Sequence, residues 1–370
     1  MVPAFLFFQI WYKNVNLFRV KNKRRRPTKR WDSANKKMKK ALLTGGTGFI
    51  GYHIIRRLCH ENVAVRCLVR HTSSRSGLQA FDVEYCVGEL HDPESLRRAV
   101  EGCDTVFHLA GLVRARNYRE FENVNRFGTE NLARASAGCS PPPVFVYVSS
   151  LAAAGTSMPH QPRKETDPAM PISKYGKSKL AGEAALMQFA GQMPCTIVRP
   201  CIVFGEADRM NLEIFRFVKK WGMCPIPGYG DKCYSWIHAD DLSDLLITAA
   251  RKGERLGQNP LLGTGIYLAS SDTGRKMSEI GHIIAGSLGK DRVCTVHCTP
   301  IPLWAISTFY EVKKWCTGHM QPFDWEKAWE ALHHWTCSPE KAQSQLNFSP
   351  QPLEKRIYQT TQWFSENGWL

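Results

Sequence analysis

A tyrosine and a lysine one helical turn apart form the clearest chemical pair in this sequence. Tyr175 and Lys179 lie four residues apart in a segment with a helical pattern, so their side chains would share one helical face. A phenol has a reference pKa of about 10 and is a poor base at neutral pH, but a nearby ammonium favours its ionised form. The pair therefore predicts acid–base catalysis at Tyr175, with Lys179 lowering the pKa of the phenol.

This spacing is not specific by itself, because Tyr310 and Lys314 repeat it. We interpret that second pair as the surface of an amphipathic helix. Tyr175 differs because Ser150, which ends a continuous apolar strand, lies 25 residues before it. A serine hydroxyl at that strand end can hydrogen-bond the reacting oxygen to which the tyrosine gives, or from which it takes, a proton. Ser149 is the alternative, since one residue of register exchanges the side chain that points at the site.

A glycine-rich turn indicates where a dinucleotide would bind. The sequence Thr-Gly-Gly-Thr-Gly-Phe-Ile-Gly at 44–51 follows a short apolar run at 41–43 and precedes apolar residues at helical spacing. Gly45 permits a sharp turn, Gly48 lets the backbone approach a pyrophosphate at the helix N-terminus, and Gly51 lets the helix pack close to the sheet. The alternative is an ordinary glycine-rich turn between a strand and a helix.

Strand and helix patterns alternate from this turn to the serine pair. The strand patterns are followed by turns and helical patterns, and they cover residues 63–69, 83–87, 104–111 and 144–148. Such alternation predicts a parallel sheet with helices on both faces, and ligands in these folds lie beyond the carboxyl ends of the strands. We therefore expect an α/β fold, a doubly wound parallel sheet, with a smaller mixed C-terminal lobe for the substrate.

The end of the second strand bears on the choice of cofactor. Arg70 lies 19 residues past Gly51, and no acidic residue occupies this strand end. A carboxylate there would bind the ribose 2′-hydroxyl of NAD, whereas an arginine accommodates the 2′-phosphate of NADP. The sequence favours NADP and leaves NAD open; the alternative for Arg70 is a solvated surface side chain.

Together, these motifs resemble the extended short-chain dehydrogenase/reductase family of the NAD-dependent epimerase/dehydratase type. The resemblance covers residues 38–370 and includes the Arg-Pro-x-x-Val-x-Gly segment at 199–205. It implies a supporting role for Asn125 in the active site, beside Ser150 and the tyrosine–lysine pair. The family more often carries aspartate where this chain has glutamate at position 89. The resemblance implies cofactor contacts at Gly45, Gly48, Phe49, Ile50, Gly51, Arg70, Glu89, Leu90, Ala110, Gly111, Tyr175, Lys179, Pro200 and Val203.

Within this family the chain most resembles the dihydroflavonol reductase and 3β-hydroxysteroid dehydrogenase branch. That resemblance implies hydride transfer between the nicotinamide and an alcohol or ketone carbon of an apolar small molecule. A nucleotide-sugar epimerase or dehydratase is one alternative, but those enzymes usually carry asparagine where this chain has Ile202. A non-catalytic NADP-sensing module is the second, and such modules typically lack the tyrosine–lysine pair.

The net charge of +16 is concentrated at one end of the chain. Residues 1–40 hold thirteen Lys or Arg and one Asp, which leaves +4 for the rest, so the charge does not indicate a nucleic-acid-binding fold. Residues 1–12 are apolar but shorter than the ~20 residues that a membrane span needs. We expect residues 1–37 to be a disordered tail or a misassigned start, and to be dispensable.

The remaining expectations concern organisation and surroundings. We expect a cofactor domain at 38–205 and a substrate lobe at 206–370, with 236–250 returning to the first domain. There, Asp241 should cap a helix and His238 should be a structural residue at a strand end.

Thirteen scattered cysteines indicate reduced thiols and a cytoplasmic protein. The Cys-x-x-x-Cys at 294–298 lacks a second ligand pair, so we expect no metal. The expected partner is a small molecule, without nucleic acid or a membrane span, and a homodimer is left open.

Overall fold

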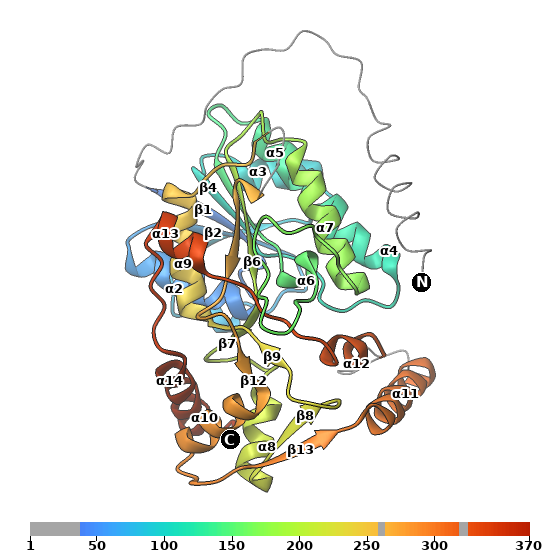
Figure 1. Ribbon diagram of the computed structural model, residues 1–370. Helices are drawn as coiled ribbons and strands as arrows, with labels where there is room; N and C mark the ends of the chain where they lie inside the picture. Colours follow the sequence, from blue (N-terminus) through green and yellow to red (C-terminus); the bar gives the residue numbers. More distant parts are fainter. Residues whose placement is uncertain (1–37, 258–262, 318–324) are drawn as a thin grey trace, which may run out of the picture. The chain divides into compact units, whose positions relative to one another are not determined.

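The computed structural model describes residues 38–257, 263–317 and 325–370 (Figure 1). The predictions about residues 1–37 lie outside the described residues.

One seven-stranded parallel sheet is built from strands between residues 40 and 269 (Figure 1). The strand order is β11-β6-β5-β4-β1-β2-β3, and every neighbouring pair is parallel. The predicted doubly wound sheet is thereby confirmed. Its strands are β1 (Lys40–Thr44), β2 (Ala64–Val69), β3 (Val83–Val87), β4 (Thr105–His108), β5 (Val144–Val148), β6 (Cys195–Pro200) and β11 (Ile266–Ala269).

Helices cover both faces of this sheet because its strands are apolar on both sides. On one face Ile54 and Leu58 of α2 pack with Leu246 of α9, and on the other Leu132 of α5 packs with Leu186 of α7. The first face is covered by α2 (Phe49–His60), α9 (Ala239–Lys252) and α13 (Glu340–Leu346), and the second by α3 (Pro93–Val100), α5 (Thr129–Ala137) and α7 (Lys174–Met187).

Short irregular helices adjoin the carboxyl ends of the strands. A 3₁₀ turn, η1 (Ser76–Leu78), follows β2, and α6 (Leu151–Ala154) follows β5. Between β4 and α5 the chain forms α4 (Tyr118–Phe121) and then a π-helical stretch, η2 (Glu122–Gly128), which contains Asn125. Widened helical turns of this kind occur often at functional sites.

Several segments after β6 build a mixed lobe with its own core around Phe215, Ile280 and Phe364. Three two-stranded sheets lie in it: β7–β10 and β8–β13 are parallel, and β9–β12 is antiparallel. The boundary near residue 205 stays a prediction. The elements are β7 (Ile202–Phe204), α8 (Leu212–Trp221), β8 (Met223–Pro227), β9 (Cys233–Tyr234), β10 (Trp236–His238), β12 (Arg275–Lys276), α10 (Met277–Ser287), β13 (Cys294–Cys298), α11 (Pro300–Thr317), α12 (Trp325–Ala331) and α14 (Leu353–Glu366).

Across the described ranges, no helix combines the length and the apolar character that crossing a bilayer requires.

Candidate functional site

The glycine turn between β1 and α2 has the geometry of an anion cradle. Gly45 has a φ of +74°, and a Cβ there would lie 2.8 Å from the Ala110 nitrogen. A Cβ on Gly51 would lie 2.4 Å from the Gly45 oxygen. The helix begins after Gly48 without a side-chain cap and without an acidic residue in its first turn, which contains Phe49. Its first N–H groups are thus available to an anion, and these residues fit a pyrophosphate.

The other predicted cofactor residues also lie at the carboxyl edge of the sheet. Their places follow from the strand ends: Arg70 after β2, Glu89 and Leu90 after β3, Ala110 and Gly111 after β4, Pro200 at the end of β6, and Val203 in β7. Arg70 is exposed, and its guanidinium forms no ion pair within the ranges that the structure describes. Its predicted contact with a phosphate stays a prediction.

The predicted catalytic residues come together at the start of α7. Tyr175 is half-buried in its first turn, and the Ser150 side chain lies close enough to its phenol to favour the ionised form. Ser150 also caps α6, where its hydroxyl accepts a hydrogen bond from the Ala152 nitrogen at 3.1 Å. One turn further along α7, the buried Lys179 donates from Nζ to the Val148 oxygen at 2.8 Å. The fold thus brings the side chains of Ser150, Tyr175 and Lys179 together at the carboxyl end of β5.

Register decides between the two neighbouring serines. The Ser149 hydroxyl donates to Glu183 Oε1 at 2.5 Å, inside a buried ion pair between Glu183 and Arg199. Ser150 points the other way, to Tyr175. Because successive strand residues face opposite sides, only one of the two can meet the phenol.

Burial dominates the electrostatics of the tyrosine–lysine pair. It raises the pKa of Tyr175 to about 12, against the opposing effect of the Ser150 side chain. It lowers the pKa of Lys179 to about 7, opposed by the charge of Glu183. The predicted lowering of the Tyr175 pKa is wrong for this structure, because the same burial that destabilises a phenolate also destabilises the ammonium that was to stabilise it.

Asn125 supports this region without touching Tyr175. Its Nδ2 donates to the Leu112 oxygen at 2.9 Å and to Ser178 Oγ at 2.8 Å, and its Oδ1 accepts from the Leu112 nitrogen at 2.8 Å. The buried amide therefore fixes the chain that follows β4 to the catalytic helix α7. A Cβ on Gly111 would lie 3.0 Å from Asn125 Oδ1 and 3.6 Å from Lys179 Nζ, so a side chain at this position would crowd the Asn125 amide.

A buried hydrogen-bond chain connects the glycine turn to Asn125. His108 lies between Thr44 Oγ1, 2.6 Å from its Nδ1, and Thr129 Oγ1, 2.9 Å from its Nε2. The Thr129 hydroxyl donates to the Asn125 oxygen at 2.8 Å, while Thr44 Oγ1 accepts from the Ala110 nitrogen. Burial lowers the pKa of His108 to about 3, so the ring is neutral and each member of the chain has a partner.

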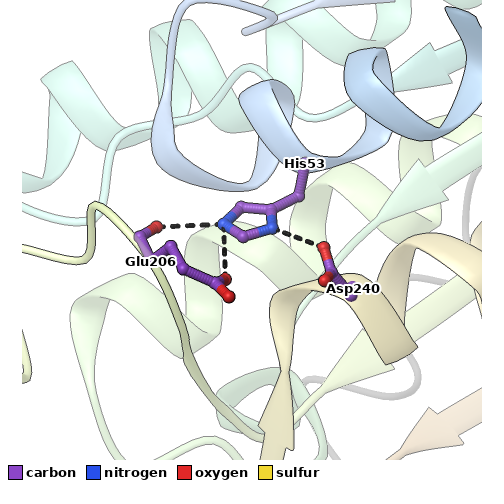
Figure 2. Close-up of side chains that lie close together, drawn as sticks. All are labelled: His53, Glu206 and Asp240. Atoms are coloured by element: carbon purple, nitrogen blue, oxygen red, sulfur yellow. Dashed lines mark hydrogen bonds and ion pairs between the residues drawn. The ribbon is translucent and has the colours of Figure 1, made fainter. Parts of the chain in front are cut away.

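A second polar cluster joins α2 to the segment after β7 (Figure 2). His53 Nδ1 lies 2.7 Å from Asp240 Oδ1, and its Nε2 lies 3.0 Å from the Glu206 backbone oxygen. Burial would raise the pKa of Asp240, but its hydrogen bond with His53 and the nearby positive charges hold it well below its usual range. These distances are also compatible with a metal ion, but both ring nitrogens face acceptor oxygens, and Arg56 and Arg356 form ion pairs with Asp240. The arrangement is that of an ion-pair cluster.

The cap of α9 differs from the prediction. His238 precedes the helix, and its Nδ1 accepts a hydrogen bond from the Asp240 nitrogen at 3.2 Å. Asp241 lies inside the first turn, where it forms an ion pair with Arg356 of α14. The predicted cap at Asp241 is wrong because His238, the residue before the helix, already accepts a hydrogen bond from an N–H group of the first turn, that of Asp240.

Sequence reasoning missed the contribution of α12. Glu326 Oε1 accepts hydrogen bonds from the backbone nitrogens of Lys174 at 2.6 Å and Tyr175 at 3.3 Å. Lys327 Nζ lies 5.6 Å from the centroid of the Tyr175 ring. These contacts join residues 151 and 152 positions apart, so no local pattern indicates them. The second tyrosine–lysine pair begins at Tyr310 of α11; the side chain of its lysine lies outside the described residues.

Comparison with known proteins agrees with this geometry. A family model described as the NAD dependent epimerase/dehydratase family matches residues 41–262. A ceramide reductase of Caulobacter vibrioides (strain NA1000 / CB15N) is 28% identical over 331 residues, which are 89% of this chain and 95% of the relative. A putative dihydroflavonol 4-reductase of Synechocystis sp. (strain ATCC 27184 / PCC 6803 / Kazusa) is 24% identical, covering 89% and 95%. The solved UDP-glucose 4-epimerase of Thermotoga maritima with UDP-glucose has a similar fold, with a TM-score of 0.69, 20% identity, and coverage of 89% and 99%.

Proposed function

Because the chain belongs to the NAD-dependent epimerase/dehydratase family, we propose that this enzyme is an NADP-dependent reductase of an apolar ketone. The observation that carries the proposal is the placement of the Ser150 side chain beside the Tyr175 phenol, with Lys179 one turn along the same helix. These three side chains lie beyond the carboxyl end of β5, on the edge of the sheet that also holds the glycine turn.

Each of these side chains has a definite task in the reduction. The hydroxyls of Ser150 and Tyr175 together bind the ketone oxygen, which polarises the carbonyl. Tyr175 donates its proton to this oxygen as the carbonyl carbon is reduced, and Ser150 holds the phenol in place. Lys179 lies beneath them, fixed to the Val148 oxygen, where it is positioned to meet the ribose of the cofactor. The nicotinamide supplies the hydride when bound, and its pyrophosphate would be held by the turn at Gly45–Gly51.

The protonation state of Tyr175 supports reduction over oxidation. With a pKa of about 12, caused first by burial, the phenol carries its proton at neutral pH. A protonated phenol is the form that a ketone reduction consumes, whereas alcohol oxidation begins from the phenolate. The enzyme should therefore reduce ketones faster than it oxidises the matching alcohols near pH 7.

Two further observations support the choice of cofactor and substrate. The exposed Arg70 at the end of β2 suits the 2′-phosphate of NADP. Ile202, partly buried in β7, offers no hydrogen bond to a sugar diphosphate and favours an apolar ligand. The relatives named ceramide reductase and dihydroflavonol 4-reductase also suggest an apolar ketone.

The test is the loss of absorbance of NADPH with purified enzyme and a panel of steroid, flavonoid and long-chain ketones. Tyr175→Phe should bind the cofactor normally but lose turnover by ~10²–10⁴-fold, the usual contribution of positioned acid–base catalysis. Tyr310→Phe is the matched control, since it changes a tyrosine of the same spacing outside the site, and it should be near neutral. Full activity in Tyr175→Phe would contradict the mechanism.

A nucleotide-sugar epimerase is the second candidate, because the family model that matches the chain includes such enzymes. In that reaction the cofactor is used without being released, so no net loss of NADPH would be seen. Calorimetry with UDP-glucose and UDP-galactose separates the two candidates. We expect weak or absent binding, and micromolar binding of either sugar would favour the epimerase.

A further inference from the structure

Helix α12 contacts the catalytic helix at the tyrosine itself. Glu326 accepts hydrogen bonds from the first two backbone nitrogens of α7, those of Lys174 and Tyr175 (α7 and α12, Figure 1). Ser173 accepts from the third, the Gly176 nitrogen, at 3.0 Å. The N-terminus of α7 is therefore held by a carboxylate from the C-terminal lobe, and the next turn of α12 lies beside the Tyr175 phenol.

That turn carries an ion pair. Lys327 Nζ lies 2.6 Å from Glu330 Oε2 and 5.6 Å from the centroid of the Tyr175 ring. Both distances start from the same ammonium nitrogen, so Lys327 connects the Glu330 carboxylate with the ring of Tyr175. The negative charge of Glu330 adds to burial in raising the pKa of Tyr175.

The Glu330 carboxylate is only half satisfied. The residue is 9% exposed, its Oε2 accepts from Lys327, and its Oε1 has no hydrogen-bond partner among the described residues. A buried carboxylate oxygen without a donor is costly, and in native structures such atoms have a functional explanation or an unseen partner. A carboxylate oxygen accepts hydrogen bonds and does not donate them, so its partner has to be a donor.

We propose that Glu330 Oε1 binds a second polar group of the substrate, a hydroxyl or an amide N–H close to the ketone that Tyr175 reduces. This inference rests on the proposed function. Lys327 orients the carboxylate from its other side, and the pair as a whole is neutral, so it suits an uncharged ligand. The substrate class is then an apolar ketone with a neighbouring hydrogen-bond donor.

The test compares two ketones that differ by one hydrogen-bond donor. Decyl hydroxymethyl ketone carries a hydroxyl beside the carbonyl, and decyl methoxymethyl ketone replaces its hydrogen by a methyl group. The wild-type enzyme should prefer the hydroxyl compound in kcat/KM by about tenfold or more, the usual contribution of a hydrogen bond to a charged group. Glu330→Met should abolish this preference, and Glu330→Gln, which keeps a neutral acceptor, should retain part of it.

Glu213→Gln provides the matched control. Glu213 forms an ion pair with Arg216 at the same three-residue spacing, on the exposed surface of α8, and its loss should leave the preference at the wild-type value. Equal kcat/KM for the two ketones with the wild-type enzyme, which needs no folded variant, overturns the assignment of Glu330 and leaves the reductase function standing. An undiminished preference in Glu330→Met has the same consequence. If neither ketone is reduced, both this inference and the proposed function are contradicted.

Discussion

Two buried glutamates lie near the catalytic residues, and they differ in how many of their oxygens have partners. Glu183 is fully buried: its Oε1 accepts from Ser149 Oγ and Arg199 Nε, and its Oε2 accepts from the other guanidinium branch at 2.6 Å. Glu330 is nearly as buried, but only its Oε2 has a partner among the described residues. Glu183 lies on α7, the helix that carries Tyr175 and Lys179, and Glu330 lies on α12, which contacts the start of that helix.

The difference separates a structural carboxylate from one that a ligand can use. The partners of Glu183 are Ser149, directly after β5, and Arg199 of β6, so they tie the sheet to α7 and give both carboxylate oxygens a donor. The partner of Glu330 is Lys327 of the same short helix, and one oxygen is left over. Burial alone therefore does not distinguish the two roles; the count of satisfied oxygens does.

The largest expected effect is on stability at Glu183. Glu183→Gln leaves the Arg199 guanidinium buried without its charge partner, and breaking a buried pair in this way costs about 3–5 kcal/mol of the free energy of unfolding. Urea unfolding followed by circular dichroism measures it. Glu330→Gln is the control, and it should lose less than about 1 kcal/mol, because its partner Lys327 can turn to water. Similar losses in the free energy of unfolding of the two variants would show that Glu183 and Glu330 do not differ in their structural role.

The second prediction extends the comparison to two arginines. Arg199 is buried and paired with Glu183, whereas Arg70 is exposed at the rim of the cofactor site. If Arg70 binds the 2′-phosphate as proposed, Arg70→Asp replaces that partner by a repelling charge, and the ratio of NADP to NAD affinity should fall by roughly tenfold or more. Cofactor fluorescence titration gives both dissociation constants. The same charge change in Arg98→Asp, on the exposed surface of α3, should leave their ratio unchanged.

The smallest effect is expected at Glu326, which directly precedes Lys327 of the Lys327–Glu330 ion pair. Glu326→Ala removes the acceptor for the nitrogens of Lys174 and Tyr175, a loss typical of a helix cap at about 1 kcal/mol. Because Tyr175 lies in this first turn, kcat for ketone reduction should fall several-fold while the dissociation constant of NADPH stays constant. Glu340→Ala, at an exposed first-turn glutamate of α13, should change neither quantity. An unchanged kcat in Glu326→Ala would mean that α12 does not position the tyrosine.

Much of the fold could be predicted because its signals are local. The boundaries of β3 and β5 agree with the apolar runs that the sequence shows at 83–87 and 144–148. Each of these signals depends on a few adjacent residues. The cap of α9 was misassigned to Asp241, because the helix begins earlier than expected, at Ala239, and His238 is the residue that precedes it.

The candidate site could be predicted only in part. Spacing brought Tyr175, Lys179 and Ser150 into consideration, and the structure places them together. It also reverses the expected shift in the pKa of Tyr175, since burial is a property of the packed protein and not of a four-residue spacing.

The sequence by itself determined the parallel sheet, the glycine turn and the helix that presents Tyr175, because alternation, turn chemistry and helical period all act over short distances along the chain. Only the tertiary structure decided which side chains surround that tyrosine. Glu326, Lys327 and Glu330 reach it from about 150 residues away, and no pattern in the chain records that contact. Whether a buried carboxylate is satisfied, as at Glu183, or left with a free oxygen, as at Glu330, depends on donors supplied by packing.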